Sequence, residues 1–294
     1  MTATMGQGGT LQKAALLLAC LLISAVLSGC MSMASERMTG HLKAAMLSQD
    51  DPETVLAAAP AFLLLTESMI AESPDDPNLL MAGAELSSAY AALLLDPERR
   101  RRLSSRSFGY ASRGLCVSYP EICETREGSF DDFTPAVDKV AAGDLDRLYV
   151  FATAWAGWME SSAGDIAALA DLPKLEYVFD FILAAEPDFQ AGRAQLYAGA
   201  LAALRPRALG GNPEKARGHF EQALNYSDGR DLMVQVEFAR RYARQAPDQA
   251  LHDRLLNEVL EADPQAPGLT LSNTVAQAEA EDLLAEDYFY EETE

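Results

Sequence analysis

The chain has 294 residues, which is enough to bury the core of one large domain or of two small ones. Hydrophobic residues make up 49% of it and charged residues 23%, so a disordered or collagen-like protein is excluded. Asp and Glu number 44 against 23 Lys and Arg, which gives a net charge of −21 at pH 7. A surface this acidic repels phosphate backbones, and we expect no nucleic-acid partner.

The N-terminal segment predicts an export signal. Lys13 is followed by an apolar run over residues 14–27, which is too short for a membrane span of about 20 residues. The run ends in Leu-Ser-Gly-Cys, which resembles the lipobox of bacterial lipoproteins and has its cysteine at Cys30. The resemblance implies a signal peptide over residues 1–29 and a lipid attached to Cys30. The alternative is a hydrophobic run that precedes a cysteine by chance.

The residue after the cysteine bears on location. Met31 stands there, and not the Asp that often retains lipoproteins at the inner membrane. Acyl chains on one cysteine are sufficient for stable anchoring. We therefore expect the protein at the periplasmic face of the outer membrane, held to the membrane through Cys30.

Two further cysteines remain in the exported chain, because Cys20 leaves with the signal. Cys116 and Cys123 are close enough in sequence to form a disulfide in an oxidising compartment, and two free thiols are the alternative. We expect no metal site, because the histidines are scattered and lie far from both cysteines. They are His41, His219 and His252.

Beyond residue 50 the sequence predicts one helix after another, because alternating runs rich in Val, Ile and Thr are nearly absent. Four helix starts pair an N-cap Asp or Asn with a proline suited to the first helical position. The fold class is therefore all-α, with the longest irregular stretch over residues 119–135. The expected helices are 52–72, 77–95, 97–118, 144–162, 173–186, 188–205, 213–226, 230–245, 247–262 and 269–287.

The helices come in antiparallel pairs of about 34 residues, which is the length of a tetratricopeptide (TPR) repeat. Ala216, Phe220 and Ala223 follow the small-large-small pattern of the second helix of such a repeat. Small residues let paired helices approach, and the large residue fills the groove between repeats. We therefore expect TPR-like helical hairpins packed into a compact bundle or solenoid.

The expected domain organisation has four parts. A signal peptide over residues 1–29 precedes a lipidated tether and short helix over residues 30–50. The TPR-like helical domain follows over residues 51–290, and residues 291–294 are an acidic tail.

An ordered set of landmarks runs through residues 42–289. They are APAFLLL from position 59, PNLL from 77, LYVF from 148, WAGW from 155, LGGNPEKA from 209, HFEQAL from 219 and LSNTVAQ from 271. In this order the chain resembles the TPR lipoproteins that accompany tripartite ATP-independent periplasmic (TRAP) transporters, the TatT component family.

The resemblance implies a function and partners. The expected protein is a lipid-anchored periplasmic accessory that docks the TRAP substrate-binding protein and passes a small apolar ligand through a channel. The resemblance also implies a homo-oligomer, a trimer, and no cofactor. The alternative is a structural TPR lipoprotein that scaffolds an envelope complex without a ligand.

Aromatic residues of the predicted helix 144–162 are candidates for lining such a channel. They are Tyr149, Trp155 and Trp158. The alternative is packing between repeats, since aromatic stripes on helices usually belong to the core.

Consecutive arginines follow Pro97 in this acidic chain. Positive charge in the first turns of a helix opposes the helix dipole. Contact with anionic headgroups near the anchor or with an acidic partner would explain these arginines, and a solvated helix face is the alternative. The candidates are Arg99, Arg100, Arg101 and Arg102.

No catalytic pattern stands out. The glycines at 210 and 211 are not followed by the Gly-Lys-Ser/Thr of a phosphate-binding loop, and His219 with Glu221 does not make a His-Glu-x-x-His zinc motif. No Gly-x-Ser-x-Gly elbow occurs. Glu160, near the tryptophans, is expected to have a helix-surface role. We therefore expect a protein that is not an enzyme.

Overall fold

The computed structural model describes residues 43–162, 170–205, 207 and 211–289. Within these ranges the regular elements are helices and no strand occurs, which confirms the all-α prediction. The predicted signal peptide, Cys30 and the acidic tail lie outside the described residues.

Helices of three kinds follow one another along the chain. The 3-10 segments are η1 (Ala142–Asp144) and η2 (Phe189–Gly192), and the π-helix is η4 (Phe238–Ala243). The α-helices are α2 (Pro52–Glu72), α3 (Pro77–Ala92), α4 (Pro97–Ser118), α5 (Pro120–Arg126), α6 (Phe130–Val137), α7 (Leu145–Ser161), α9 (Leu172–Ala185), α10 (Arg193–Ala202), α11 (Pro213–Tyr226), α12 (Leu232–Glu237), α13 (Gln249–Glu261) and α14 (Thr270–Ala285).

The Asp-Pro pairs start helices as the sequence predicts. Asp51, Asp76 and Asp96 each accept two backbone N–H groups at the starts of α2, α3 and α4, and a proline occupies the first turn. Asn212 accepts from the Lys215 N–H at the start of α11. Each such cap is worth about 1 kcal/mol of stability, which is why local sequence placed these boundaries correctly.

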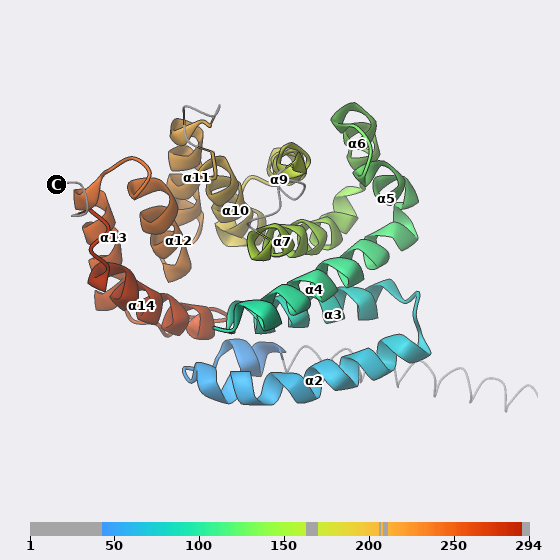
Figure 1. Cartoon of the computed structure of the whole chain (residues 1–294), viewed down its shortest axis with the longest axis horizontal. Coiled ribbons are helices and arrows are strands. Elements are labelled where there is room, and N and C mark those ends of the chain that lie inside the picture. Colours follow the sequence, from blue (N-terminus) through green and yellow to red (C-terminus); the bar gives the residue numbers. More distant parts are fainter. Residues whose placement is uncertain (1–42, 163–169, 206, 208–210, 290–294) are drawn as a thin grey trace, which may run out of the picture.

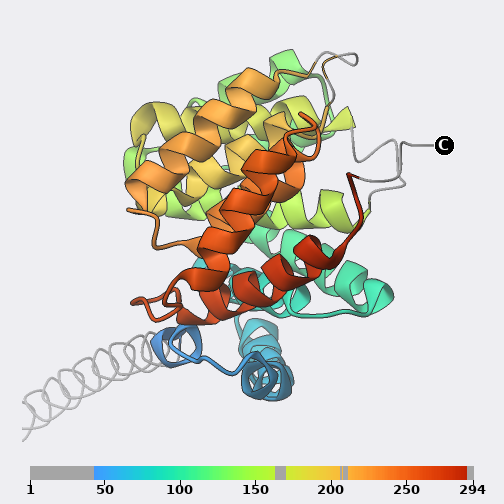
Figure 2. The same ribbon diagram turned by 90° about the vertical axis from the view of Figure 1, so that its left-hand side faces the viewer.

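Successive helices pack against one another in a curved row (Figure 1). α3 packs on α4, α4 on α7, α9 on α10, and α10 on α11. The row then bends back through α12 and α13, so that α14 returns to contact α2. The view turned by 90° shows α2 at one edge of the molecule, with α13 and α14 above it (Figure 2).

The buried core falls into clusters. The largest joins α3, α4, α6, α7, α9 and α10 around Phe133, Phe151 and Trp155. A second cluster includes residues of every helix from α10 through α14 and surrounds Phe220 and Phe238, whose ring centroids are 5.0 Å apart. Phe133, Phe151, Trp155 and Phe220 are among the largest side chains that are fully buried.

Two predicted segments differ from the structure in more than the exact end residues. Residues 119–135, expected to be irregular, contain α5 and most of α6, because Ser129 caps α6 and its apolar residues Phe133 and Val137 are buried. The expected helix 188–205 is broken at Gly192, which has φ 91°. A Cβ there would lie 3.0 Å from the Ala223 carbonyl oxygen, so α10 and α11 approach too closely for a side chain.

Helix α2 stands apart in composition. It is long and apolar enough to cross a membrane by length and composition, with a mean hydropathy of 1.7 over its most apolar window, of which 22% is buried. Core helices of soluble proteins can pass the same test, so this property alone does not make α2 a membrane span. Here α2 packs along α3 and exposes its other face.

Candidate functional site

The inward faces of α7 and α10 bring together a group of aromatic rings. Tyr149 and Tyr197 contact each other edge to face, with ring centroids 6.0 Å apart. Phe179 stacks on Tyr197 at 5.5 Å, and Phe189 packs on Tyr149 at 5.3 Å. Burial, with a smaller contribution from the neighbouring phenol, raises the pKa of Tyr149, and burial is also the main cause of the raised pKa of Tyr197. Both phenols are therefore neutral at physiological pH and can donate a hydrogen bond.

An ion pair lies beside these tyrosines and joins α10 to α12 and α14. Arg193 Nε donates to Asp231 Oδ2 at 2.8 Å, and Arg193 Nη2 donates to Ser272 Oγ at 3.2 Å. Burial alone would lower the pKa of Arg193, but Asp231 together with Tyr149 and Tyr197 raises it above its ordinary value. The other carboxylate oxygen of Asp231 is buried and has no hydrogen-bond partner among the described residues.

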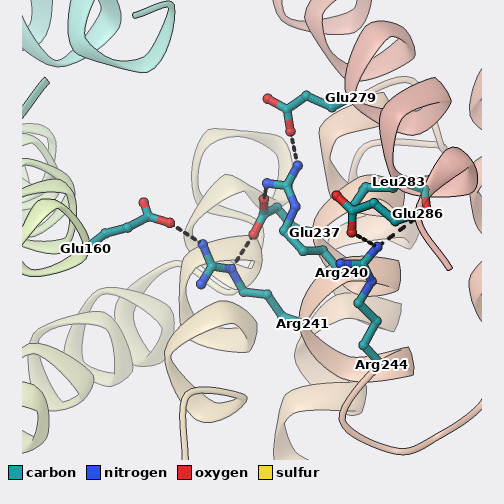
Figure 3. Close-up of polar contacts among 8 residues, drawn as sticks. All are labelled: Glu160, Glu237, Arg240, Arg241, Arg244, Glu279, Leu283 and Glu286. Atoms are coloured by element: carbon teal, nitrogen blue, oxygen red, sulfur yellow. Dashed lines mark hydrogen bonds and ion pairs between the residues drawn. The ribbon is translucent and has the colours of Figure 1, made fainter. Parts of the chain in front are cut away.

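A second set of charges connects α7, the α12–η4 segment and α14 (Figure 3). Glu237 accepts hydrogen bonds from both Arg240 and Arg241. Arg241 Nη2 reaches Glu160 Oε1 at 2.6 Å, and Arg240 pairs with Glu279. Burial would lower the pKa of Arg241, but Glu237 and Glu160 together raise it above its ordinary value. We call Glu160, Glu237, Arg240, Arg241 and Glu279 the charge junction.

The two arginines of the charge junction lie in the π-helix η4. η4 follows α12 without a break, and Arg240 and Arg241 stand three and four residues after Glu237, so both side chains reach its carboxylate. π-helical turns are rare and are found mostly where a local function or a packing constraint maintains them. Arg244, just beyond η4, pairs with Glu286 at 2.7 Å. Ion pairs from Arg240, Arg241 and Arg244 therefore join this segment both to α7 and to α14.

This region presents ion pairs and neutral phenols. Its charged groups are matched ion pairs, and its phenols hold their protons. Among the described residues no group of three His, Cys, Asp or Glu side chains could hold a metal ion. The region can hold helices at a fixed separation and present aromatic and hydroxyl groups.

The structure brings two of the three predicted channel residues, Trp155 and Trp158, against the ring of Phe108 and places Tyr149 in a different aromatic group. Trp155 is 0% exposed and packs between Phe108 and Phe133 in the core. Trp158 is half-buried and also stacks on Phe108, with ring centroids 5.5 Å apart. Tyr149 is six residues before Trp155 on a helix with 3.6 residues per turn, so it faces a different direction.

The four predicted arginines have different surroundings. Arg99 donates to the Tyr90 hydroxyl and lies over its ring, and Arg100 donates twice to the Leu94 carbonyl. Arg101 and Arg102 are exposed and lie 3.6 and 3.9 Å from the Glu98 carboxylate. Arg100 therefore binds a carbonyl group just beyond the C-terminal end of α3. The guanidinium groups of Arg99, Arg101 and Arg102 lie at the surface.

Two pockets lie away from the aromatic cluster. One, of about 270 Å³, lies between α2, α3 and α4, and Arg99 and Arg102 are part of its lining. The other, of about 170 Å³, lies by Tyr119 and Lys139. Neither is lined by Tyr149, Trp155 or Trp158.

The cysteines Cys116 and Cys123 lie in α4 and α5. Their Cα atoms are 6.0 Å apart, a separation that a disulfide spans. The bridge remains a prediction, as does lipidation of Cys30, which lies outside the described residues.

The charge junction and the pair of Arg193 and Asp231 were not predicted from the sequence. The sequence does show a second group of basic residues, Arg240, Arg241 and Arg244, but the neighbouring sequence does not identify the acidic residues with which they pair. Glu160 keeps an exposed side chain as expected, and it also pairs across the molecule with Arg241.

The chain was compared with known proteins and protein families. A search of curated proteins finds no match. The model of a family described as "TRAP transporter T-component" matches residues 48–290, which is most of the chain. The family expected from the landmarks is confirmed, and the chain belongs to the TRAP transporter T-component family.

Proposed function

We propose that this protein is a lipid-anchored accessory of a TRAP transporter that works in the periplasm and docks the transporter's substrate-binding protein. The observation that carries the proposal is the family match over residues 48–290. The net charge of −21 supports a division of roles, because an acidic body is a poor receptor for organic anions. Capture of the anionic solute then belongs to the binding protein.

The anchor is part of the proposal. The Leu-Ser-Gly-Cys sequence supports lipidation of Cys30, and Met31 supports the outer membrane as the destination. From Cys30 to Lys43, the first described residue, the chain can extend at most about 45 Å. The body would therefore stay near the membrane surface. Labelling with a radioactive fatty acid should mark the wild-type protein and not Cys30→Ala, and label on the variant would contradict the anchor.

The ligand is the second part. A small apolar ligand would contact the rings of Tyr149 and Tyr197, which are half-buried and carry hydroxyl groups that can orient it. Trp158 retains some exposed surface, whereas Trp155 is enclosed by its core neighbours. The trimer implied by the family resemblance belongs to the same proposal.

A scaffold without a ligand is the second candidate function. The charge junction favours it, because each of its two guanidinium groups pairs with two carboxylates and these ion pairs hold α7, η4 and α14 together. A rigid array of this kind suits a protein whose task is to present a surface.

The docking experiment uses the lipidated full-length product in detergent and the substrate-binding protein of the same transporter. We expect a saturable complex in isothermal titration calorimetry, and an unrelated periplasmic binding protein serves as the control. Absence of a complex with the cognate binding protein at 100 μM, a concentration well above about 10 μM needed for a weak specific interface, would contradict docking. Native mass spectrometry of the same sample separates the two functions, because a carried apolar molecule adds mass and a scaffold does not.

A further inference from the structure

Helix α2 presents an apolar surface that no described part of the chain covers. Leu64, Leu65 and Met69 are 68%, 56% and 37% exposed. From Thr54 to Thr66 the helix has no charged residue. Single exposed apolar side chains are common on soluble proteins, but a continuous apolar helix face marks an interaction surface.

The pocket beside this face joins apolar and basic groups. Its apolar wall includes Leu63, Leu64 and Leu103 from α2 and α4. Its charged lining is Arg99, Arg102 and Arg106 from α4, with Glu67 of α2 as the acid among them.

Arg106 is already neutralised, because it forms an ion pair with Glu67. Arg99 lies over the Tyr90 ring, at 5.1 Å from its centroid, and donates to the hydroxyl without losing its charge. Arg102 is 63% exposed and reaches Glu98 only at 3.9 Å. Two guanidinium charges are therefore open to an incoming anion, in a chain whose net charge is −21.

The position of this surface relates it to the N-terminus. Lys43 forms an ion pair with Glu85 of α3 at 3.0 Å, and α2 begins only nine residues later, at Pro52. The first described residues and α2 lie along the same edge of the molecule (Figures 1 and 2). A lipid on Cys30 would thus hold this edge, rather than the α9–α11 side, near the bilayer.

We propose that the outer face of α2 and the adjoining pocket form a docking surface for an anionic phospholipid bilayer. Arg99 and Arg102 bind the headgroup phosphate, since one guanidinium group can donate two parallel hydrogen bonds to two phosphate oxygens. Leu64, Leu65 and Met69 enter the boundary between headgroups and acyl chains, as the apolar face of an interfacial helix does. The inference uses the proposed lipid anchor but is independent of any binding-protein partner.

The test measures contact of α2 with lipid while the anchor stays constant. The lipidated protein carrying Leu65→Trp is reconstituted on vesicles of phosphatidylethanolamine and phosphatidylglycerol, with bromine on the acyl chains as a fluorescence quencher. The signal of the native tryptophans is subtracted with the wild-type protein. We expect a blue-shifted, quenched signal from the tryptophan introduced by Leu65→Trp, and no such change for Val117→Trp, whose site is 49% exposed at the other end of α4.

A matched pair of charge reversals tests the pocket in the Leu65→Trp background. Arg101 and Arg102 are neighbours on α4, they have similar exposure, and both lie near Glu98, but only Arg102 lines the pocket. We expect Arg102→Glu to weaken the docked fraction at least about fivefold and Arg101→Glu to weaken it less than about twofold, because each basic group at an anionic surface contributes about fivefold. The docked fraction should also fall as salt rises.

Several results would overturn the proposal. Equal quenching of the Leu65→Trp and Val117→Trp proteins means that α2 does not touch lipid. Equal loss from the two arginine reversals means that the pocket does not receive the headgroup. A blue shift that depends on protein concentration and is insensitive to bromine means that a second copy of the chain covers the face. Loss of binding-protein docking with retained quenching affects only the proposed function above, so the two failures are distinguishable.

Discussion

Arg241 and Glu160 are 81 positions apart in the sequence, yet Arg241 Nη2 donates to Glu160 Oε1 at 2.6 Å. The contact joins the end of α7 to the π-helix η4. Because Arg241 also donates to Glu237, one guanidinium group holds two carboxylates from different parts of the row. The charge junction thus fixes the separation between α7 and the C-terminal helices of the row (Figure 3).

Removing Arg241 tests the junction. The side chain of Arg241 is 22% exposed and that of Glu237 is 13% exposed, so Arg241→Ala leaves a carboxylate that is mostly buried with one partner fewer. We expect a loss of about 2–3 kcal/mol in the free energy of unfolding, measured by urea titration with far-UV circular dichroism.

The matched control is Arg254→Ala. Arg254 pairs with Glu258 at 2.9 Å on one helix face, and both side chains are largely exposed. Such pairs contribute about 0.3–0.5 kcal/mol. If both variants lose the same stability, the junction has no special structural role.

The parts of the fold that follow from the sequence are those with local determinants. The N-caps Asp51, Asp76 and Asp96 act within their own first turns, so three helix starts agree with the prediction. The break at Gly192 depends on how closely α11 approaches, and this is a tertiary fact that the local sequence does not contain. The ion pairs of the charge junction also depend on tertiary structure, because helical periodicity does not indicate which distant helix supplies a partner.

The candidate site shows the same division. Helical spacing placed Tyr149 and the tryptophans on one element, but spacing alone could not separate core from accessible faces. The structure encloses Trp155 and groups Tyr149 with Tyr197, which the sequence analysis did not single out.

The two tryptophans should differ in their contribution to stability. Trp155 is fully buried and Trp158 is half-buried, although both rings contact Phe108. We expect Trp155→Ala to cost about 4 kcal/mol, because it leaves a large cavity, and Trp158→Ala about half of that. Urea unfolding followed by far-UV circular dichroism gives both values. A smaller loss at Trp155 than at Trp158 would contradict the burial described for α7.

The pair of Cys116 and Cys123 gives a redox prediction. With Cα atoms 6.0 Å apart, the two residues can be joined without moving α4 or α5. A bridge over so short a loop should add about 2 kcal/mol. We expect no free thiol in the exported, denatured protein and a lower melting temperature after reduction. The double variant with serine at both positions should melt like the reduced protein and be insensitive to reductant, and two titratable thiols in the exported protein would refute the pairing.

His219 should make the stability depend on pH. Burial, with a smaller contribution from Lys215, lowers the pKa of His219 below 6.5, and its Nδ1 lies 2.6 Å from the Gln195 side-chain oxygen. In the unfolded chain the imidazole of His219 therefore takes up a proton near pH 6.5, whereas in the folded chain it stays neutral. The stability is fully present above that pH and falls as the pH decreases toward the pKa of His219 in the folded protein. We expect urea titrations from about pH 7.5 to about pH 5 to show a smaller decrease for His219→Asn than for the wild-type protein, because the variant lacks this protonation. An equal decrease in both, or an NMR titration midpoint of His219 above 6.5, would show that the imidazole is not held neutral by its surroundings.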